Sequence, residues 1–302
     1  MRIGTQTSDL IYKYSPDALF ALFRETGFDC VDFGLDVFLS GKIVESGESS
    51  PVFDGSLDET RAVLMPYKEA ARRAGIGFYQ AHAPYKFQAE STRVQLAVKR
   101  CVEICGFLEC PYLIVHPLFL EYDDRRKWSS HDEWSVNVDY FSGLMQACRE
   151  NKVRVCLENM FTDHNDRIMQ AICSEMDEAI RYIDFLNEKA GWDCFGFCLD
   201  TGHLMLFAKD QYKAISTLGS RLLALHINDN DGYTDQHIAP YMGAVDWDAV
   251  TRGLREIGYN GALCFEAGKA YRRFDEKLLP DLLRLISACG RLFWERINGC
   301  EM

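Results

Sequence analysis

The chain of 302 residues lacks the features that mark membrane and secreted proteins. It has no run of about 18 uninterrupted apolar residues, so the sequence predicts no membrane span. Its start has no apolar segment of the kind found in secretory signals, so we expect a cytoplasmic protein. None of the twelve cysteines forms a CxxC pair, and we interpret them as buried thiols in a reducing compartment.

Positive charge is also scarce in this sequence. Lys and Arg number 33 against 45 Asp and Glu, so the net charge is −12. Because no run of basic residues offsets this balance, we expect no nucleic acid as a partner. The apolar content of 48% nevertheless provides for a large core. We therefore expect a globular protein that acts on a small molecule, with a homo-oligomer as an option.

Short apolar runs alternate with longer amphipathic stretches along the whole chain. The predicted strands are Arg2–Gln6, Cys30–Leu35, Gly77–Ala81, Tyr112–His116, Val153–Glu158, Phe195–Asp200, Leu222–Ile227 and Ala262–Glu266. The predicted helices are Pro16–Thr26, Asp58–Ala74, Ser91–Leu108, Asp132–Asn151, Ser174–Ala190, Leu204–Leu218, Asp246–Ile257 and Leu278–Arg296.

Strict alternation of strands and helices favours a parallel sheet, and eight such units are the number that closes a barrel. The sequence therefore predicts an α/β fold, a (β/α)₈ TIM barrel, as a single domain over residues 1–302. The alternative is an open doubly wound sheet. That fold usually has a Gly-rich turn after its first strand, where this chain has Thr7, Ser8 and Asp9.

Six consecutive predicted strands end in an imidazole or a carboxylate. These residues are His82, His116, Glu158, Asp200, His226 and Glu266. In a barrel the carboxyl ends of all strands surround one mouth, so we expect the side chains to converge. Clustered carboxylates repel one another unless a cation lies between them. The predicted ligands of a divalent metal are Glu158, Asp200, His226 and Glu266. Oxygen-rich ligation with one nitrogen favours Mn²⁺, with Mg²⁺, Co²⁺ or Zn²⁺ as alternatives.

Five short motifs carry a family resemblance. They are LENM (157–160), CLDTGH (198–203), LHINDN (225–230), DQHIAPYMGAVDW (235–247) and FEAG (265–268). In this order they resemble the sugar isomerase/epimerase superfamily with a xylose-isomerase-like barrel. The resemblance implies the same four metal ligands. It also implies that Glu158 and Glu266 act as the acid/base pair and that His203 binds the substrate.

The implied reaction is a proton transfer next to a carbonyl group. The ion polarises the carbonyl, one carboxylate removes the neighbouring proton, and the resulting enediolate is stabilised by the cation. Return of the proton to the opposite face gives epimerisation, and return to the adjacent carbon gives isomerisation. We expect a metal-dependent isomerase or epimerase of a sugar, an inositol derivative or a small hydroxy-ketone. The chain shows no obvious Gly-rich phosphate cradle, which favours an unphosphorylated substrate.

One segment departs from the resemblance. Ketose 3-epimerases often carry an Arg shortly after the His of the seventh strand, where this chain has residues 228–231, NDND. A known ketose-epimerase substrate is therefore less strongly implied. Aromatic residues near the strand ends are interpreted either as a platform for a sugar or as barrel packing. They are Tyr79, Tyr85, Phe87, Phe119 and Phe161.

Two other function classes stay open. The same superfamily contains endonuclease IV-type enzymes, which cut abasic DNA with three zinc ions. The residues that match those ligands are His82, His116, Glu158, Asp200, His203, His226, Asp235, His237 and Glu266. The additional five, namely His82, His116, His203, Asp235 and His237, are therefore substrate-binding residues or ligands of a second metal. A non-catalytic sugar-binding barrel is the third class. An absent metal ligand would favour it, and all four are there.

Overall fold

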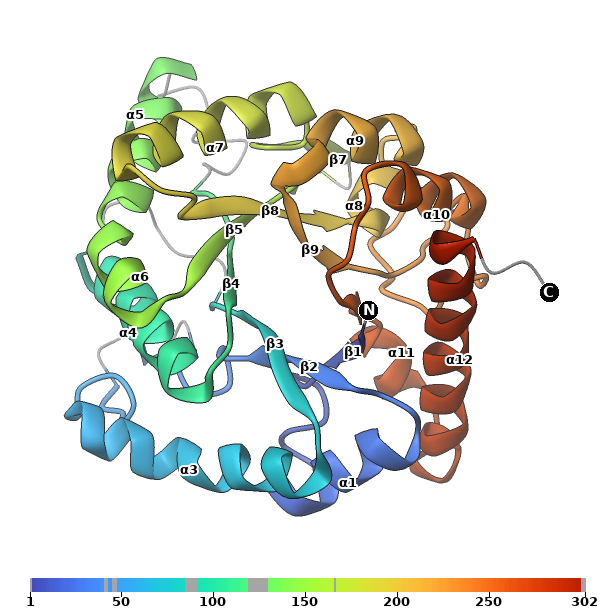
Figure 1. Cartoon of the computed structure of the whole chain (residues 1–302), viewed down its shortest axis with the longest axis horizontal. Helices are drawn as coiled ribbons and strands as arrows, with labels where there is room; N and C mark the ends of the chain where they lie inside the picture. The colour runs from blue at the N-terminus through green and yellow to red at the C-terminus, as the bar shows by residue number, and fades with distance from the viewer. Residues whose placement is uncertain are drawn as a thin grey trace. The chain divides into compact units, whose positions relative to one another are not determined.

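A computed structural model describes residues 2–40, 43–44, 48–84, 92–118, 130–165 and 167–299 of the protein. Eight strands pair in one sheet in the order β10-β1-β2-β3-β4-β5-β8-β9 (Figure 1). Strand β1 pairs in parallel with β10 and β2, and β4 pairs in parallel with β3 and β5. A bridge between Ile227 and Phe265 joins the two ends of this order, so the sheet closes. The predicted (β/α)₈ barrel is confirmed.

All eight predicted strands are found, and every strand end lies within one residue of its predicted position. Their bounds are β1 Ile3–Gln6, β2 Cys30–Gly34, β3 Gly77–His82, β4 Tyr112–Val115, β5 Arg154–Glu158, β8 Phe195–Asp200, β9 Leu222–His226 and β10 Leu263–Phe265. Strand β8 is buried along its whole length, as an inner strand covered on both faces should be.

The helices fill the intervals between the strands. Their bounds are α1 Pro16–Glu25, α3 Leu57–Ala74, α4 Thr92–Leu108, α5 Ser130–Ser142, α6 Met145–Asn151, α7 Met176–Ala190, α8 Thr201–Met205, α9 Gln211–Leu218, α10 Trp247–Glu256, α11 Gly268–Arg273 and α12 Leu279–Asn298. Asp246 is the N-cap of α10, because its side chain accepts a hydrogen bond of 2.9 Å from the amide of Ala249. None of the helices within the described ranges has both the length and the apolar character that a membrane crossing requires.

Two helices that the sequence predicts as continuous are broken, and these predictions were wrong. The stretch Asp132–Asn151 forms α5 and α6, which are separated at Gly143. A Cβ at this position would lie 1.8 Å from Nε2 of Gln95, which donates to the carbonyl of Tyr140 near the end of α5. The stretch Leu204–Leu218 forms α8 and α9 instead, since Asp210 starts α9 by accepting from the amide of Lys213.

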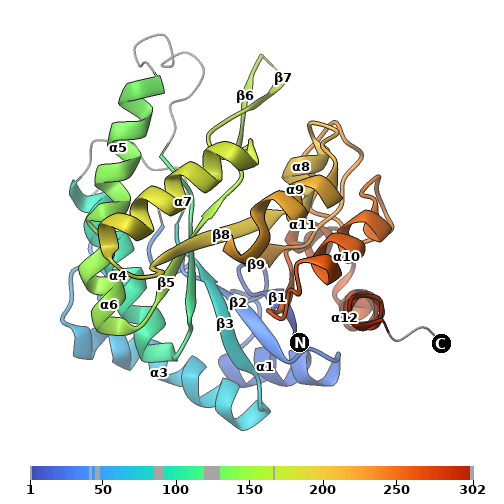
Figure 2. The same ribbon diagram turned by 45° about the horizontal axis from the view of Figure 1, so that its top comes forward.

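A hairpin that the sequence analysis missed follows β5. Strands β6 (Phe161–His164) and β7 (Arg167–Gln170) pair in antiparallel register and extend away from the carboxyl end of β5 (Figure 2). Backbone hydrogen bonds between Met160 and the residues 171 and 172 close its base. The hairpin therefore begins just after Glu158, the last residue of β5.

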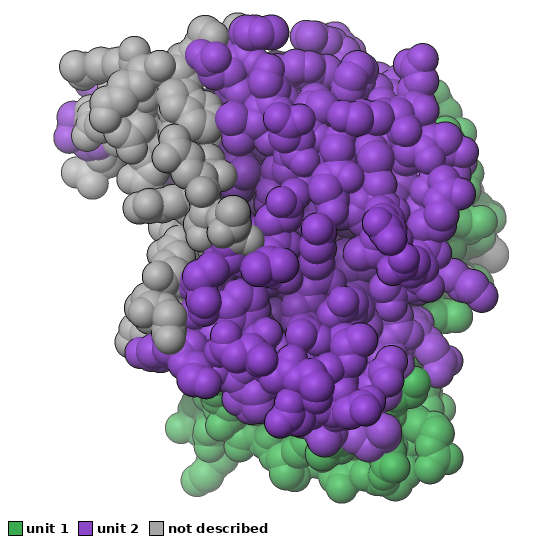
Figure 3. Space-filling view, turned by 90° about the vertical axis from the view of Figure 1, so that its left-hand side faces the viewer, with its two compact units in different colours: residues 1–33, 66–79, 198–302 green, residues 34–65, 80–197 purple. Residues whose placement is uncertain are grey.

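The chain divides into two compact units (Figure 3). Unit 1 comprises residues 1–33, 66–79 and 198–302, and unit 2 comprises residues 34–65 and 80–197. In unit 1, α12 packs on β1 and β10, where Gly290 allows close contact with Ile3 and Phe265. In unit 2, α4 packs against α6 and α5 against α7. The single domain over residues 1–302 stays a prediction.

Candidate metal centre and active site

In unit 2, two histidines meet one glutamate at the carboxyl ends of neighbouring strands. His82 is the last residue of β3, His116 follows β4, and Glu158 is the last residue of β5. The Nε2 atoms of His82 and His116 lie 3.5 Å and 3.0 Å from Oε2 of Glu158, whose side chain is only 1% exposed. These three residues form a group that could hold a metal ion.

The hydrogen bond of His82 determines which of its nitrogens can bind an ion. Its Nδ1 lies 2.6 Å from the carbonyl oxygen of Ala83, and a carbonyl only accepts, so Nδ1 carries a proton. In a neutral ring Nε2 then has a lone pair, which faces the Glu158 carboxylate. Two acceptors face each other in this way only when a second proton or a cation lies between them.

In unit 1, Asp200 ends β8 and its carboxylate is held at both oxygens. Oδ1 accepts 2.7 Å from the amide of His203, which makes Asp200 the N-cap of α8. Oδ2 accepts 2.7 Å from the amide nitrogen of the Asn228 side chain. Asn228 in turn lies against Gly202, where a Cβ would be 2.0 Å from Asn228 Oδ1. The glycine of the CLDTGH motif is therefore required by the close approach of Asn228.

His226 ends β9 between two carboxylates of unit 1. Its Nε2 lies 2.9 Å from Oδ2 of Asp32, which belongs to β2, and its Nδ1 lies 3.3 Å from Oε2 of Glu266. The ring of His226 is fully buried, and Glu266 follows β10 directly. As with His82, both ring nitrogens face oxygen acceptors.

A second cluster of unit 1 contains His203, Asp235, His237 and Lys269. His237 Nδ1 donates to the carbonyl oxygen of Glu266 at 3.0 Å, and its Nε2 lies 3.0 Å from Oδ2 of Asp235. The same Oδ2 is 2.7 Å from the ammonium of Lys269, while His203 Nε2 lies 3.8 Å from the other oxygen. Asp200, His203 and His237 form a further group that could hold a metal ion.

The charges of this second cluster shift two pKa values in opposite directions. Burial alone would raise the pKa of Asp235, but the hydrogen bond and charge of His237, together with His203 and Lys269, hold it well below its usual range. Burial alone would lower the pKa of His237, but the negative charges of Glu266 and Asp235 raise it to about 10. His237 is therefore an imidazolium at neutral pH in the metal-free protein.

In the metal-free protein, we expect His237 to stabilise the fold at neutral pH and to lose this effect in alkali. A pKa of about 10, raised from the ordinary 6.5, means that the contribution is complete below pH 6.5 and disappears as the pH rises through 10. Thermal denaturation of the wild type and His237→Gln with a chelator present, from about pH 6 to about pH 11, measures it. The difference in Tm should shrink towards zero in alkali, and a constant difference would contradict the assignment.

The NDND segment, where the resemblance suggested an arginine, has structural tasks in this chain. Asn228 holds Asp200, and the Asn230 side chain donates to the carbonyl oxygen of Gly202 at 2.9 Å. Asp229 is fully buried and accepts from the amides of Asn230 and Val245 and from the indole of Trp247. Asp231 lies in an exposed turn, where its carboxylate accepts from the amides of Tyr233 and Thr234.

Some predicted residues lie outside the candidate centre or outside the described ranges. Tyr79 packs against Cys30, Ala262 and Cys264, and its hydroxyl donates to the carbonyl oxygen of Leu223. This is the barrel-packing interpretation. Among the other aromatic residues, Phe161 starts the β6–β7 hairpin. The other three aromatic residues predicted near the strand ends, Tyr85, Phe87 and Phe119, lie outside the described ranges.

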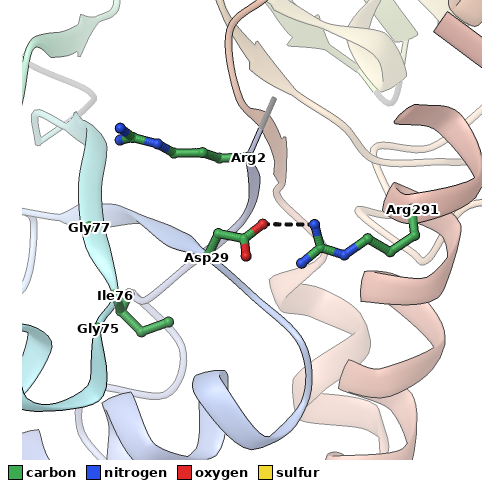
Figure 4. Close-up of a pocket in the computed structure, with 6 residues that line it drawn as sticks. All are labelled: Arg2, Asp29, Gly75, Ile76, Gly77 and Arg291. Carbon is green, nitrogen blue, oxygen red and sulfur yellow. Dashed lines mark ion pairs between the residues drawn. The ribbon is translucent and has the colours of Figure 1, made fainter. Parts of the chain in front are cut away.

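Unit 1 also has a hollow at the amino ends of its strands (Figure 4). It measures about 550 Å³ and is lined by Arg2, Asp29, Gly75, Ile76, Gly77 and Arg291. Asp29 accepts from the amide of Ile3 at 2.9 Å and forms an ion pair of 2.9 Å with Arg291. Polar groups at the amino ends of barrel strands generally serve stability, and the bonds of Asp29 agree with such a role.

Sequence reasoning missed Asp32 and did not give Asn228 or Lys269 a role in the site. Asp32 lies inside the buried strand β2, where a carboxylate without a partner would be costly. That cost was the available signal for Asp32.

Comparisons with known proteins agree with this architecture. Inosose isomerase of Bacillus subtilis (strain 168) is 24% identical over 174 residues, which cover 56% of this chain and 58% of the relative. A solved D-tagatose 3-epimerase-like protein matches with a TM-score of 0.72 at 17% identity over 99% of both chains. The solved IolI protein with a bound zinc atom has a TM-score of 0.68 at 18% identity, covering 100% of this chain and 99% of its own.

At these identities the two structural likenesses show the fold alone. The sequence profile of one protein family, the xylose isomerase-like TIM barrel, matches residues 20–289, which is most of the chain. This match agrees with the resemblance carried by the five motifs and with the closed eight-stranded sheet. The chain belongs to the xylose isomerase-like TIM barrel family.

Proposed function

We propose that this chain is a divalent-metal-dependent isomerase or epimerase of a small carbohydrate. The proposed ligands of its ion are Glu158, Asp200, His226 and Glu266. They stand at the carboxyl ends of β5, β8, β9 and β10, which in a TIM barrel surround one mouth. Mn²⁺ is the ion we propose first because three carboxylates and one imidazole suit it, with Mg²⁺, Co²⁺ and Zn²⁺ as alternatives. The zinc atom of the IolI protein supports a divalent ion without selecting Mn²⁺.

The observation that carries the proposal is the orientation of the imidazole rings. His82, His226 and His237 each direct both ring nitrogens at oxygen acceptors. A neutral ring has one N–H group, so each of these rings needs a second proton or a cation next to its carboxylate. A cation at the carboxylates of Glu158 and Glu266 would meet this need for His82 and His226. The buried donor set therefore fits a divalent ion.

The ion would supply Lewis-acid chemistry, polarising the substrate carbonyl and stabilising the enediolate. We assign the proton transfers to Glu158 and Glu266. The side chain of Glu158 is 1% exposed and that of Glu266 is 18% exposed, so one base is sealed from water and the other borders it. Two bases on opposite faces of the substrate carbon suit epimerisation, whereas one base that serves two adjacent carbons suits isomerisation.

We propose an unphosphorylated sugar, inositol derivative or small hydroxy-ketone as the substrate. The names of two similar proteins, inosose isomerase and D-tagatose 3-epimerase-like protein, support this class. Two cationic side chains of α11 are already bound to carboxylates. Lys269 binds Asp235, and Arg272 lies 3.1 Å from Asp9. Neither cation is therefore available for a phosphate group without breaking an ion pair.

A zinc phosphodiesterase of the endonuclease IV type is the second candidate. Two further groups that could hold ions favour it, His82–His116–Glu158 and Asp200–His203–His237. Against it, the Lys269 ammonium already neutralises Asp235 at 2.7 Å, in the place where a third zinc would need that carboxylate. The net charge of −12 also opposes binding to a polyanion.

A cytoplasmic location is part of the proposal. None of the eleven cysteines within the described ranges forms a disulfide and all of them are buried, as expected of thiols in a reducing compartment. A homo-oligomer remains an option that light scattering or sedimentation would test.

The function is tested by metal analysis followed by proton exchange. The protein is loaded with Mn²⁺ and incubated in D₂O with free ketoses and cyclic polyhydroxy ketones. We expect about one Mn²⁺ per chain and solvent deuterium at the carbon next to the carbonyl of at least one of them. About three zinc ions with cleavage of abasic DNA would replace this proposal with the phosphodiesterase. Sugar binding without exchange would indicate a non-catalytic barrel.

A further inference from the structure

We propose that Asp32 is a positioning residue that holds His226 in the tautomer with the proton on Nε2. Asp32 and His226 both belong to unit 1, and both side chains are buried. Oδ2 of Asp32 lies 2.9 Å from Nε2 of His226, and the two residues are 2% and 0% exposed. Asp32 lies in the middle of β2 rather than at its end, and we assign it a role through His226 instead of a direct part in the chemistry.

The chemistry of the two groups determines the direction of this hydrogen bond. An ionised carboxylate only accepts, so the proton of the contact is on Nε2 of the imidazole. In the neutral ring the lone pair is then on Nδ1, which lies 3.3 Å from Oε2 of Glu266. We propose that the Nδ1 atom of His226 and the carboxylate of Glu266 both bind the ion. The partner of one ring nitrogen thus decides which nitrogen can bind an ion.

The backbone gives Asp32 the rigidity that such a role requires. It lies in β2 opposite Gln6 of β1, and its carbonyl oxygen accepts 3.0 Å from the amide of Thr7. His226 is the last residue of β9, so two strands rather than two loops set the distance between the side chains. A side chain held in this manner can fix ring orientation as well as protonation.

Asn228 orients the carboxylate of Asp200 in the way that Asp32 orients the ring of His226. Its side-chain nitrogen donates to Oδ2 of Asp200, while the amide of His203 donates to Oδ1. Thr201 accepts from the amide of Asn228 at 3.1 Å and donates to its carbonyl oxygen at 2.7 Å, which fixes the backbone that carries the carboxamide. Two proposed ligands of unit 1 are therefore oriented by neighbours that are not ligands themselves.

The assignment of Nδ1 as a metal ligand rests on the proposed function, but the protonation of the His226 ring does not. We expect Asp32→Asn to weaken Zn²⁺ and Mn²⁺ binding about 10- to 100-fold. A carboxamide can donate to Nε2, which favours the tautomer whose proton blocks Nδ1. Asp29→Asn is the matched control, because Asp29 precedes the same strand and binds Ile3 and Arg291 instead (Figure 4). It should leave metal affinity unchanged.

The measurements are competition with a chromogenic chelator and ¹⁵N NMR of histidine-labelled protein. The His226 signals are assigned by their loss in His226→Gln. The proposal predicts a wild-type His226 protonated at Nε2 and a changed ring protonation in Asp32→Asn. If Asp32→Asn does not fold, Asp32→Ser, which removes the charge and leaves space, takes its place. Thermal denaturation of each variant reports folding.

Each outcome has a distinct meaning. Wild-type metal affinity and ring protonation in the Asp32 variants would overturn the proposal. A wild type that binds no divalent ion would overturn the proposed function. In that case the ring protonation of the metal-free protein still decides the role of Asp32, so the two failures can be told apart.

Discussion

Replacing Glu158 or Glu266 with Gln is expected to lower proton exchange at the substrate carbon about 10²- to 10⁴-fold, the usual contribution of a positioned general base. The carboxamide keeps the shape of the side chain but cannot take up the proton. Because both residues are also proposed ligands, each variant is measured at saturating Mn²⁺ with its metal content determined. This separates the loss of the base from the loss of the ion. The readout is deuterium uptake from D₂O, followed by NMR of the sugar.

Glu103→Gln is the control for this pair of variants. Glu103 lies on α4 and forms an ion pair of 3.1 Å with Arg100, away from the strand ends. Its replacement should leave exchange unchanged. Deuterium uptake at the wild-type rate in both Glu158→Gln and Glu266→Gln, with the ion bound, would rule out the acid/base assignment. A loss in only one variant would indicate a single base, as isomerisation requires.

The strand and helix pattern was predictable because it depends on local periodicity. Apolar runs between amphipathic stretches identify eight strands, and the number eight with strict alternation points to a barrel. The breaks inside two predicted helices depend on tertiary contacts. The break at Gly143 depends on Gln95, which is 48 positions away in the sequence and reaches the end of α5 through space that only a glycine leaves open. Periodicity alone contains no information about such a contact.

The candidate centre was predictable only in part, for a related reason. Residues at strand ends are recognisable because an apolar run stops at a polar side chain, as at Asp200 and His226. Asp32 interrupts the apolar run of β2 instead, and nothing in the sequence relates it to a histidine 194 positions later. The NDND segment was compared with an arginine of related enzymes. In the structure, Asn228 and Asp229 point to protein groups.

Asp229→Ala is expected to have the largest effect on stability, lowering the free energy of unfolding by about 3 to 5 kcal/mol. The fully buried carboxylate accepts from the amides of Asn230 and Val245 at 3.0 Å and from the indole nitrogen of Trp247 at 3.2 Å. Its removal leaves three buried donors without this acceptor, and each such donor costs about 1 to 3 kcal/mol. Urea denaturation of the metal-free protein measures the change.

The same substitution should also disturb the second cluster of unit 1, because Asp229 holds both ends of the loop that carries Asp235 and His237. Besides its side-chain bonds, its backbone pairs with Ile238 in both directions, at 3.0 and 3.1 Å. Asp231→Ala is the matched control, since that carboxylate accepts similar amide bonds in an exposed turn and should affect stability much less. If the free energy of unfolding falls equally in the two variants, the burial of Asp229 is not the cause of the destabilisation. A large loss confined to Asp229→Ala, with the raised pKa of His237 also lost, would show that one buried carboxylate stabilises this loop and its charges together.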